Sequence, residues 1–362
     1  MALLVESCRG RYAPSPTGRL HLGNARTALL AWLAARLGGC TFVLRIEDLD
    51  RGRARPEAEG ALLDDLRWLG IDWDEGPDRP VGGPGGPGGS DGAMGAVGGS
   101  SIGAGPFRQS ERGPLYAEAV ARLLDRGLAF RCACSRAEVA RAASAPHPED
   151  DEGPPYPGTC RDLEAAAVLA VARAAGRQPS VRLRASAFGG ETFPFVDRVC
   201  GPVDPFGPPP GRPGSAGLDD FVLQRADGLA AYQLAVVVDD AAMGIGEVVR
   251  GDDLLRSTSR QLALYQAFGW SPPAFAHVPL LLAPDGLRLA KRAATRPPLL
   301  CALRDGEAGQ AGIEADRALG RLAASAGLCA PGERMSAREL LAHLGTRDAL
   351  WSRLARQPVV WA

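Results

Sequence analysis

The chain has 362 residues, of which 46% are hydrophobic and 23% are charged, and its net charge is −1. This balance supports a sizeable core and excludes binding of nucleic acid through a global basic field. No apolar run reaches about 18 residues, so no transmembrane helix is predicted, and the start MALLVESCRG does not resemble a signal peptide. We expect a cytoplasmic monomer of one or two domains, with no membrane partner and with its eight cysteines reduced.

The first 80 residues alternate between strand and helix patterns. Residues 8–13 and 40–46 are predicted to form strands, and residues 55–70, with a proline in the first turn and a glycine at the end, a helix. An earlier helix is expected from about Gly23, because apolar residues recur there at helical spacing: Ala25, Ala28, Leu29, Trp32 and Leu33. The order strand, helix, strand, helix predicts a parallel α/β sheet.

Residues 81–106 interrupt this alternation with a glycine-rich segment. Such a segment cannot bury enough side chain to offset the entropy of ordering it, so we predict a disordered surface insertion. A phosphate-binding loop is the alternative, but neither a lysine nor a helix-start signature accompanies the glycines.

The remaining chain carries further strand and helix patterns. Helices are predicted over 113–127, 161–175 and 252–268, and strands over 128–132, 180–185, 191–199, 219–224, 231–238 and 277–282. The last 70 residues are expected to be helical, and Ser336 and Glu339 have the spacing of a capping box.

The stretch RYAPSPTGRLHLGN, residues 11–24, indicates a strand, a stiffened bend and the start of a helix. Two prolines and a glycine shape the bend, and His21 stands just before the small or capping residues Gly23 and Asn24. A helix N-terminus presents unpaired N–H groups to a phosphate, and histidine can donate a further hydrogen bond. The alternative is a plain strand-turn-helix with a surface histidine.

A second basic element, GLRLAKR, follows the apolar run HVPLLL and has Lys291 at its centre. A lysine carried on a loop can stabilise the charge that develops during attack at the α-phosphate of a nucleotide. Alone, such a loop is more often simply solvated.

Three cysteines gather around one loop. Cys132 and Cys134 form a C-x-C pair, and the sequence YPGTC supplies Tyr156 and Cys160. Three thiolates and a phenolate could complete a tetrahedral zinc site, although His147 would be a more usual fourth ligand. The alternative is that the three cysteines are buried residues unrelated to a metal. The remaining cysteines are interpreted as buried small hydrophobic residues: Cys8, Cys40, Cys200, Cys301 and Cys329.

HLGN and RLAKR together resemble the HIGH and KMSKS motifs of class I aminoacyl-tRNA synthetases. GRYAPSPTGRLHLGNARTALLAWLAAR, LRIEDLDRGR and ALYQAFGW are similar to the glutamyl-tRNA synthetase branch, over residues 9–80 and 107–300. The short length and the cysteine segment resemble the glutamyl-queuosine tRNA(Asp) synthetase family, which lacks the anticodon-binding domain. This resemblance implies ATP, L-glutamate and queuosine-containing tRNA(Asp) as partners.

The resemblance also implies a domain organisation. It places a Rossmann-like parallel-sheet catalytic domain in residues 8–130 and 219–292, and an inserted zinc-bearing, acceptor-binding subdomain in residues 131–218. Residues 293–362 would form a short helical C-terminal region.

The family's glutamate-binding residues match six positions: Arg11, Ala13, Ser15, Glu47, Tyr232 and Arg250. Guanidinium groups pair with carboxylates in a bidentate manner, so Arg11 would face the side-chain carboxylate of glutamate. Glu47 would take the ammonium group, and Tyr232 and Arg250 would complete the pocket. Without the motifs around them, Glu47 could be a solvated strand end and Arg250 a structural ion pair.

The resemblance further assigns ATP to His21, Gly23, Asn24 and Lys291, with Mg²⁺ accompanying the nucleotide. His21 and Lys291 would be the catalytic residues. The loop departs from the common motif at Arg288 and Ala290, where lysine and serine are usual, and losing one hydroxyl removes about 0.5–1.5 kcal/mol of hydrogen bonding.

The family's C-x-C…Y-x₃-C pattern matches Cys132, Cys134, Tyr156 and Cys160, which implies one structural Zn²⁺, although the loop between Cys134 and Tyr156 is longer than usual. Two alternatives remain open. The chain could be a minimal glutamyl-tRNA synthetase that charges the 3′ end of tRNA(Glu), or a zinc-bearing RNA-binding paralogue without catalysis.

Overall fold

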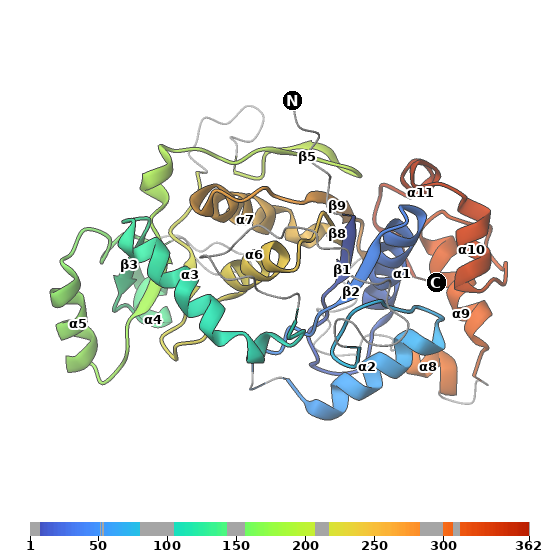
Figure 1. Ribbon diagram of the computed structural model, residues 1–362, viewed down its shortest axis with the longest axis horizontal. Helices are drawn as coiled ribbons and strands as arrows, with labels where there is room; N and C mark the ends of the chain where they lie inside the picture. The colour runs from blue at the N-terminus through green and yellow to red at the C-terminus, as the bar shows by residue number, and fades with distance from the viewer. Residues whose placement is uncertain are drawn as a thin grey trace.

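A four-stranded parallel sheet forms the centre of the molecule (Figure 1). The computed structural model describes residues 8–50, 52, 54–79, 105–142, 156–206, 217–282, 300–306 and 312–361. The sheet has the order β2-β1-β8-β9, and each neighbouring pair is parallel, which confirms the predicted sheet. Its strands are β1 (Arg9–Tyr12), β2 (Thr41–Leu44), β8 (Glu247–Gly251) and β9 (Ala274–Val278).

Both faces of this sheet are buried. Phe42 and Leu44 of β2 belong to the core that includes helix α1 (Leu22–Leu37), whereas Val43 between them packs on the opposite face with Val248 and Phe275. Successive side chains of a strand point to opposite faces, so a sheet covered on both sides reads as a continuous apolar run. That is why TFVL carries no alternation in the sequence.

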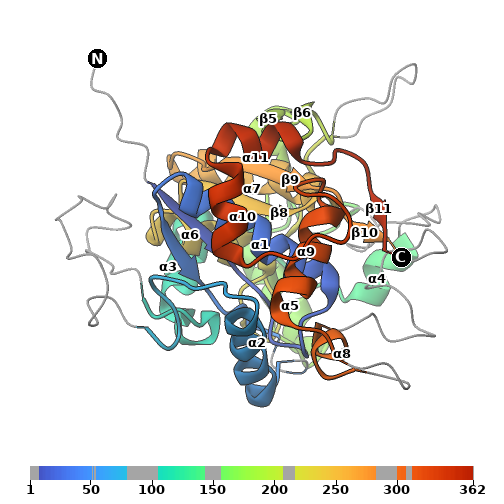
Figure 2. The same ribbon diagram turned by 90° about the vertical axis from the view of Figure 1, so that its right-hand side faces the viewer.

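The C-terminal part of the chain forms helices that pack around α1 (Figure 2). Ser336 caps one of them as predicted: its side chain accepts a hydrogen bond from the Glu339 N–H at 3.3 Å, and Glu339 Oε2 accepts one from the Ser336 N–H at 2.7 Å. The helices are α8 (Leu300–Asp305), α9 (Ala315–Ser325), α10 (Ala337–Leu344) and α11 (Arg347–Arg353). Strand β11 (Val359–Val360) then pairs with β10 (Leu281–Leu282), just after β9.

A second lobe is built on a small antiparallel sheet of the order β3-β4-β7, at the left of Figure 1. A hairpin of β5 and β6 reaches back from it to β9 of the central sheet. The strands are β3 (Ala129–Cys132), β4 (Ser180–Leu183), β5 (Phe195–Asp197), β6 (Gly201–Val203) and β7 (Val222–Gln224). The other α-helices of the described residues are α2 (Pro56–Trp68), α3 (Gly113–Asp125), α4 (Arg136–Ala142), α5 (Ala165–Ala174), α6 (Tyr232–Ala242) and α7 (Leu255–Phe268). Short 3₁₀ helices in the same ranges are η1 (Gln109–Glu111), η2 (Ala185–Phe188) and η3 (Asp252–Leu254).

The strand predicted over residues 231–238 is wrong, because this segment begins helix α6. Nearly every side chain of α6 is buried, including its polar ones, so the helix has no exposed stripe to reveal its period. Its run of three valines therefore imitates a buried strand. The strand predicted over 277–282 is divided at Pro279 between the end of β9 and the short β10.

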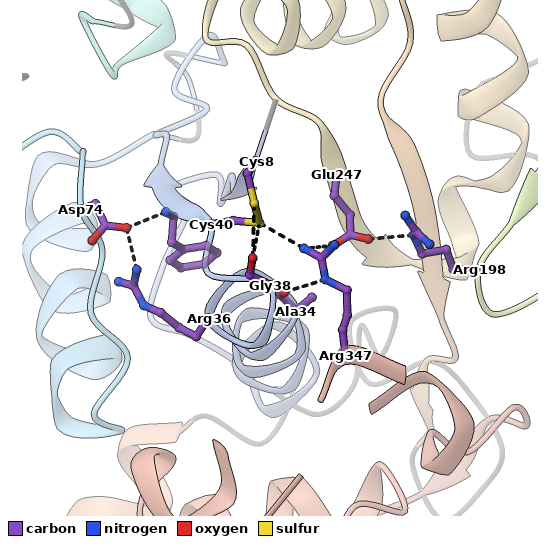
Figure 3. Close-up of a disulfide and its surroundings, with 10 residues drawn as sticks. Cys8, Ala34, Arg36, Gly38, Cys40, Asp74, Arg198, Glu247 and Arg347 are labelled. Carbon is purple, nitrogen blue, oxygen red and sulfur yellow. Dashed lines mark hydrogen bonds and ion pairs between the residues drawn. A yellow bond between two sulfur atoms is a disulfide. The ribbon is translucent and has the colours of Figure 1, made fainter. Parts of the chain in front are cut away.

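The interpretation of Cys8 and Cys40 as reduced, buried small hydrophobic residues is also wrong, because the two form a disulfide (Figure 3). Cys8 immediately precedes β1 and Cys40 precedes β2, and these strands are parallel neighbours whose register pairs Arg9 with Thr41. Equivalent positions at the start of both strands bring the two Cα atoms to 4.6 Å, within the range that a disulfide spans. The prediction of burial is wrong for Cys8 and Cys200, which are exposed, whereas Cys301 and Cys329 are half-buried.

Several expectations fall on residues that the structure does not describe. Residues 81–104 of the glycine-rich segment, His147, and the loop with Arg288, Ala290 and Lys291 lie outside the described residues. The boundaries of the predicted domains stay a prediction. Across the described ranges, none of the helices combines the length and the hydropathy that a bilayer crossing requires.

Candidate active site

A cavity of about 370 Å³ lies at the carboxyl ends of β1 and β8, where α1 begins. This edge is the usual ligand site of an open parallel sheet. All of the described residues that the sequence assigned to glutamate and ATP line the cavity: Arg11, Ala13, Ser15, His21, Gly23, Asn24, Glu47, Tyr232 and Arg250. Lys291 is the one assigned residue that lies outside the described part of the chain.

His21 caps the N-terminus of α1 with its ring. The Asn24 N–H donates to His21 Nδ1 at 3.2 Å, so the proton of the neutral ring sits on Nε2 and remains available to a ligand. Burial lowers the pKa of His21, and the nearby charge of Asp253 opposes this effect only in part. The ring is therefore neutral at pH 7. A side chain at Gly23 would approach this ring, since a Cβ atom there would lie 3.1 and 3.2 Å from its Cε1 and Nδ1.

A buried charge network holds one wall of the cavity. Arg11 Nε and Nη2 donate to Asp240 Oδ1 and Oδ2 at 3.3 and 3.4 Å, and Arg45 Nη1 donates to Asp240 Oδ1 at 2.6 Å. Arg45 Nη2 reaches Glu47 Oε1 at 3.2 Å. Burial raises the pKa of Asp240, but the charges of Arg11 and Arg45 outweigh it and hold that pKa below its usual value. Asp240 is therefore an ionised carboxylate, and it holds both guanidinium groups in place.

Arg250, on the neighbouring strand β8, also lines the cavity, and neutral groups hold it. Its Nε donates to His277 Nε2 at 3.0 Å, and its Nη2 donates to Thr258 Oγ1 at 2.6 Å. Within the described ranges, its Nη1 is buried with no hydrogen-bond partner. A buried guanidinium with a free donor in a cavity is suited to bind an anion.

Arg26, on the first turns of α1, is another buried arginine of the cavity wall. It is 1% exposed, its Nη2 donates to the Pro279 carbonyl at 2.7 Å, and its Nη1 has no partner in the described part of the chain. Burial lowers the pKa of Arg26 to about 10, so the side chain remains a cation. Arg26 was not among the predicted site residues, and its one signal in the sequence is a charged residue amid the apolar spacing of α1.

The residues that hold the cavity-lining side chains in place were also not predicted from the sequence. Asp240 and Arg45 stand beside Arg11 and Glu47, and His277 and Thr258 stand beside Arg250. They belong to no short motif, and only the fold brings them together.

The cysteine segment converges in the second lobe. The sulfur atoms of Cys132, Cys134 and Cys160 all lie within 4.8 Å of one another, and the Tyr156 hydroxyl lies 3.3 Å from Cys132 Sγ and 3.9 Å from Cys134 Sγ. A tetrahedral zinc ion with four sulfur ligands spaces them by about 3.8 Å. The three thiol groups could hold a metal ion such as zinc, and the Tyr156 hydroxyl lies beside them. The same hydroxyl accepts a hydrogen bond from the Cys160 N–H at 2.8 Å.

A larger cavity of about 760 Å³ connects these two regions. It shares Ser15, Glu47 and Tyr232 with the first cavity and extends to Cys134. Its walls carry four arginines: Arg136, Arg177, Arg182 and Arg225.

The family described as "tRNA synthetases class I (E and Q), catalytic domain" matches residues 7–298. The chain belongs to this family. The synthetase resemblance of its motifs is thereby confirmed, and the chain is an enzyme of the ligase type.

Two curated relatives of this class I synthetase cover most of the chain. The Glutamyl-Q tRNA(Asp) synthetase of Symbiobacterium thermophilum is 47% identical over 350 residues, which are 97% of this chain and 94% of that protein. The protein of the same name from Nitratidesulfovibrio vulgaris is 47% identical over 88% of this chain and 86% of its own length. The Glutamate–tRNA ligase 2 of Acidithiobacillus ferrooxidans is 45% identical over 78% of this chain, but the chain covers 52% of that ligase.

A solved structure agrees with the fold of this synthetase. The glutamate–tRNA synthetase of Elizabethkingia anophelis superposes with a TM-score of 0.73 at 26% identity and covers 98% of this chain, which in turn covers 68% of it. The parallel sheet with mixed α/β content is therefore that of a class I synthetase catalytic domain.

Proposed function

We propose that this enzyme activates L-glutamate with ATP and transfers the glutamyl group to the queuosine base of tRNA(Asp). The observation that carries the proposal is the convergence in one cavity of two guanidinium groups, Arg11 and Arg250, with the carboxylate of Glu47. This arrangement complements an amino acid that has two carboxylates and one ammonium group. The relatives named Glutamyl-Q tRNA(Asp) synthetase, similar over nearly the whole chain, support the choice of acceptor.

In this proposal Arg11 binds the side-chain carboxylate of glutamate, and Glu47 binds its ammonium group. Arg250 and Tyr232 complete the pocket, together with the backbone around Ala13 and Ser15. Burial raises the pKa of Glu47, but Arg45 and Arg11 oppose this rise, and a bound ammonium group would further favour the ionised form.

The nucleotide would lie against the start of α1. The His21 Nε2–H and the N–H groups near Gly23 and Asn24 would hold the phosphates, and Lys291 would contact them from its loop. Mg²⁺ would arrive with the ATP and neutralise part of its charge. The α-carboxylate of glutamate attacks the α-phosphate, which forms glutamyl-adenylate and releases pyrophosphate. Catalysis then rests on positioning and electrostatic stabilisation, without a protein nucleophile.

We assign the cysteine cluster to one structural Zn²⁺, with Cys132, Cys134, Tyr156 and Cys160 as the ligands. The close spacing of the three sulfur atoms around the phenol oxygen supports this assignment. The ion would supply a fixed anchor for the loops on either side of the cluster. The segment around Cys134, residues 133–136, forms one end of the arginine-lined cavity, so the same anchor would shape the entry of the tRNA.

The arginine-lined cavity is the proposed route of the acceptor. It opens onto the glutamate pocket at Ser15, Glu47 and Tyr232, so a nucleoside within it would face the activated carboxyl group. The arginines on its walls suit the phosphates that flank such a nucleoside.

A second candidate is a minimal glutamyl-tRNA synthetase that charges the 3′ end of tRNA(Glu). Relatives named as glutamate–tRNA ligases, 41–45% identical, favour it. The chain spans about half of their length, however, which leaves tRNA selection to the acceptor region. A non-catalytic RNA-binding paralogue is less consistent with a cavity that keeps His21, Glu47 and both arginines.

Glutamate-dependent ATP–pyrophosphate exchange in the absence of tRNA tests the proposal. We expect exchange with L-glutamate and little with L-glutamine, because a neutral amide cannot form an ion pair with Arg11. Exchange that requires tRNA(Glu) would support the second candidate, and no exchange under either condition would support the non-catalytic paralogue. Arg11→Met should abolish the preference for glutamate over glutamine, whereas Arg131→Met, a half-exposed arginine on β3, is the matched control.

A further inference from the structure

A buried chain of hydrogen bonds runs from the β5–β6 hairpin through the central sheet to Arg250. It starts at Asp197, continues through His277 on β9 and ends at the guanidinium on β8. Asp197 is 2% exposed, His277 is fully buried and Arg250 is 4% exposed. None of the motifs in the sequence includes Asp197 or His277 among its ligand-binding residues.

Asp197 is a carboxylate that is saturated with donors. Its Oδ1 accepts from the N–H groups of Val199 and Cys200, both at 2.9 Å, and its Oδ2 accepts from the backbone N–H of His277 at 3.0 Å. The same Oδ2 lies 2.7 Å from His277 Nδ1. Burial would raise the pKa of Asp197, but the hydrogen bonds from His277 and the Cys200 N–H hold it below its usual value.

These contacts fix the tautomer of His277. An ionised Asp197 can only accept, so Nδ1 carries the proton, and Nε2 is left as an acceptor. Arg250 Nε can only donate, and it lies 3.0 Å from His277 Nε2. A protonated ring would place two donors against each other, so the contact selects the neutral ring.

The result is a cation held by neutral groups. Arg250 is bound by His277 and by Thr258, its guanidinium lies 5.2 Å from the centre of the Phe275 ring, and among the described residues no carboxylate comes within ion-pair distance of it. Arg11 differs, because Asp240 pairs with it directly. His277 separates the carboxylate of Asp197 from Arg250. Arg250 is therefore oriented without an ion pair that would neutralise its charge.

We propose that Asp197 and His277 are positioning residues, which orient Arg250 so that its free Nη1 meets a carboxylate of glutamate. This inference rests on the proposed function for the identity of the ligand. Asp197 selects the tautomer, His277 supplies the acceptor, and Arg250 supplies the uncompensated charge. The hairpin of β5 and β6 thereby acts on the pocket without contacting the ligand.

A pair of substitutions at one position separates positioning from mere packing. The amide of His277→Asn can replace Nδ1 and keep the bond to Asp197, but it is too short to reach Arg250. The longer His277→Gln can place its amide oxygen where Nε2 lies and keep the bond to Arg250. We expect the Asn variant to raise the KM for glutamate at least about tenfold with little change in kcat, since the lost contact serves ground state and transition state alike. The Gln variant should stay within about threefold of wild type.

Asp197→Asn should also raise the KM for glutamate, because its amide N–H₂ would favour the other tautomer and present a donor to Arg250. Asp220→Asn is the matched control, since Asp220 is 2% exposed and lies in the second lobe, where it pairs with Arg161. The KM for ATP should be unchanged in all of these variants. Equal KM values for glutamate in the Asn and Gln variants of His277 would overturn the proposal.

A second readout does not depend on the substrate. In ¹⁵N-labelled protein, the Arg250 Nε–H resonance should be protected from exchange in wild type and in His277→Gln, and lost in His277→Asn. If the wild type shows no glutamate-dependent exchange, the proposed function fails, and this spectrum still decides whether the relay exists. An unprotected Arg250 resonance in the wild type would refute the relay even if the enzyme activates glutamate.

Discussion

At the scale of single residues, the cavity combines ligand-facing groups with the groups that hold them. The first kind was predictable, because Arg11, His21 and Glu47 lie in short motifs. The second kind, such as Asp240, comes from segments far away in the sequence. No local pattern marks these residues, because their partners are set by the order of the strands rather than by their spacing along the chain.

Gly23→Ala should weaken ATP binding. Its Cβ would lie 3.1 Å from the His21 ring, so the ring would have to shift by a few tenths of an ångström and its Nε2–H would no longer be aimed at the phosphate. The loss of one hydrogen bond to a phosphate would raise the KM for ATP about tenfold, or ~1.4 kcal/mol. Gly60→Ala within α2 is the control, since nothing lies within 4 Å of its Cβ. An unchanged KM for ATP in the first variant would show that the cap does not matter for the nucleotide.

Stability should fall as the pH drops below about 6.5, the pKa of a histidine in an unfolded chain. Burial lowers the pKa of both His21 and His277 in the folded state, so the unfolded chain takes up protons first. The free energy of unfolding then decreases as the pH falls below about 6.5. Above this pH, the two histidines do not change it. Urea denaturation between pH 8 and pH 5 measures the trend. His277→Gln should flatten it, and a slope that is equally steep in this variant would contradict the assignment.

At the scale of secondary-structure elements, the alternation of strand and helix in the first 80 residues predicted the sheet correctly. The prediction failed at α6, because a helix that is buried on nearly all sides shows no period. It also failed for Cys8 and Cys40, whose proximity follows from the register of β1 and β2. The hydrophobic period of an element is visible in the sequence only where one of its faces is exposed to solvent. An element that is surrounded by protein shows no such period.

The disulfide should stabilise the start of the sheet. It closes a loop with a sequence separation of 32, which corresponds to roughly 3–4 kcal/mol if its effect is on the unfolded chain. Cys40→Ser should therefore lower the free energy of unfolding by about 2–4 kcal/mol under non-reducing conditions. Urea denaturation with and without reductant measures it, and Cys200→Ser, an exposed free cysteine, is the control. The disulfide would have no stabilising role if wild type and the Cys40 variant unfolded alike without reductant.

At the scale of the whole molecule, the two proposed steps are assigned to different lobes. The cavity proposed to form the adenylate lies at the edge of the central sheet, whereas the cysteine cluster lies in the second lobe beside the sheet of β3, β4 and β7. The large cavity joins them. This division predicts that damage to one lobe affects one step more than the other.

Cys160→Ser should remove the metal ion and impair transfer while sparing activation. We expect about one zinc per wild-type chain by elemental analysis and much less in the variant. Transfer to tRNA should fall at least about tenfold, while pyrophosphate exchange stays within about twofold, because the adenylate pocket contains none of these ligands. Cys329→Ser serves as the control. An equal loss of both activities would argue against separate roles for the two lobes.

The most direct test of the account is transfer of labelled glutamate to two preparations of tRNA(Asp), one with queuosine and one without it. We expect label only on the preparation with queuosine, and nuclease digestion should recover that label on the modified nucleoside. Label on the 3′-terminal adenosine, or on tRNA(Glu) instead, would contradict the account and identify a minimal glutamyl-tRNA synthetase.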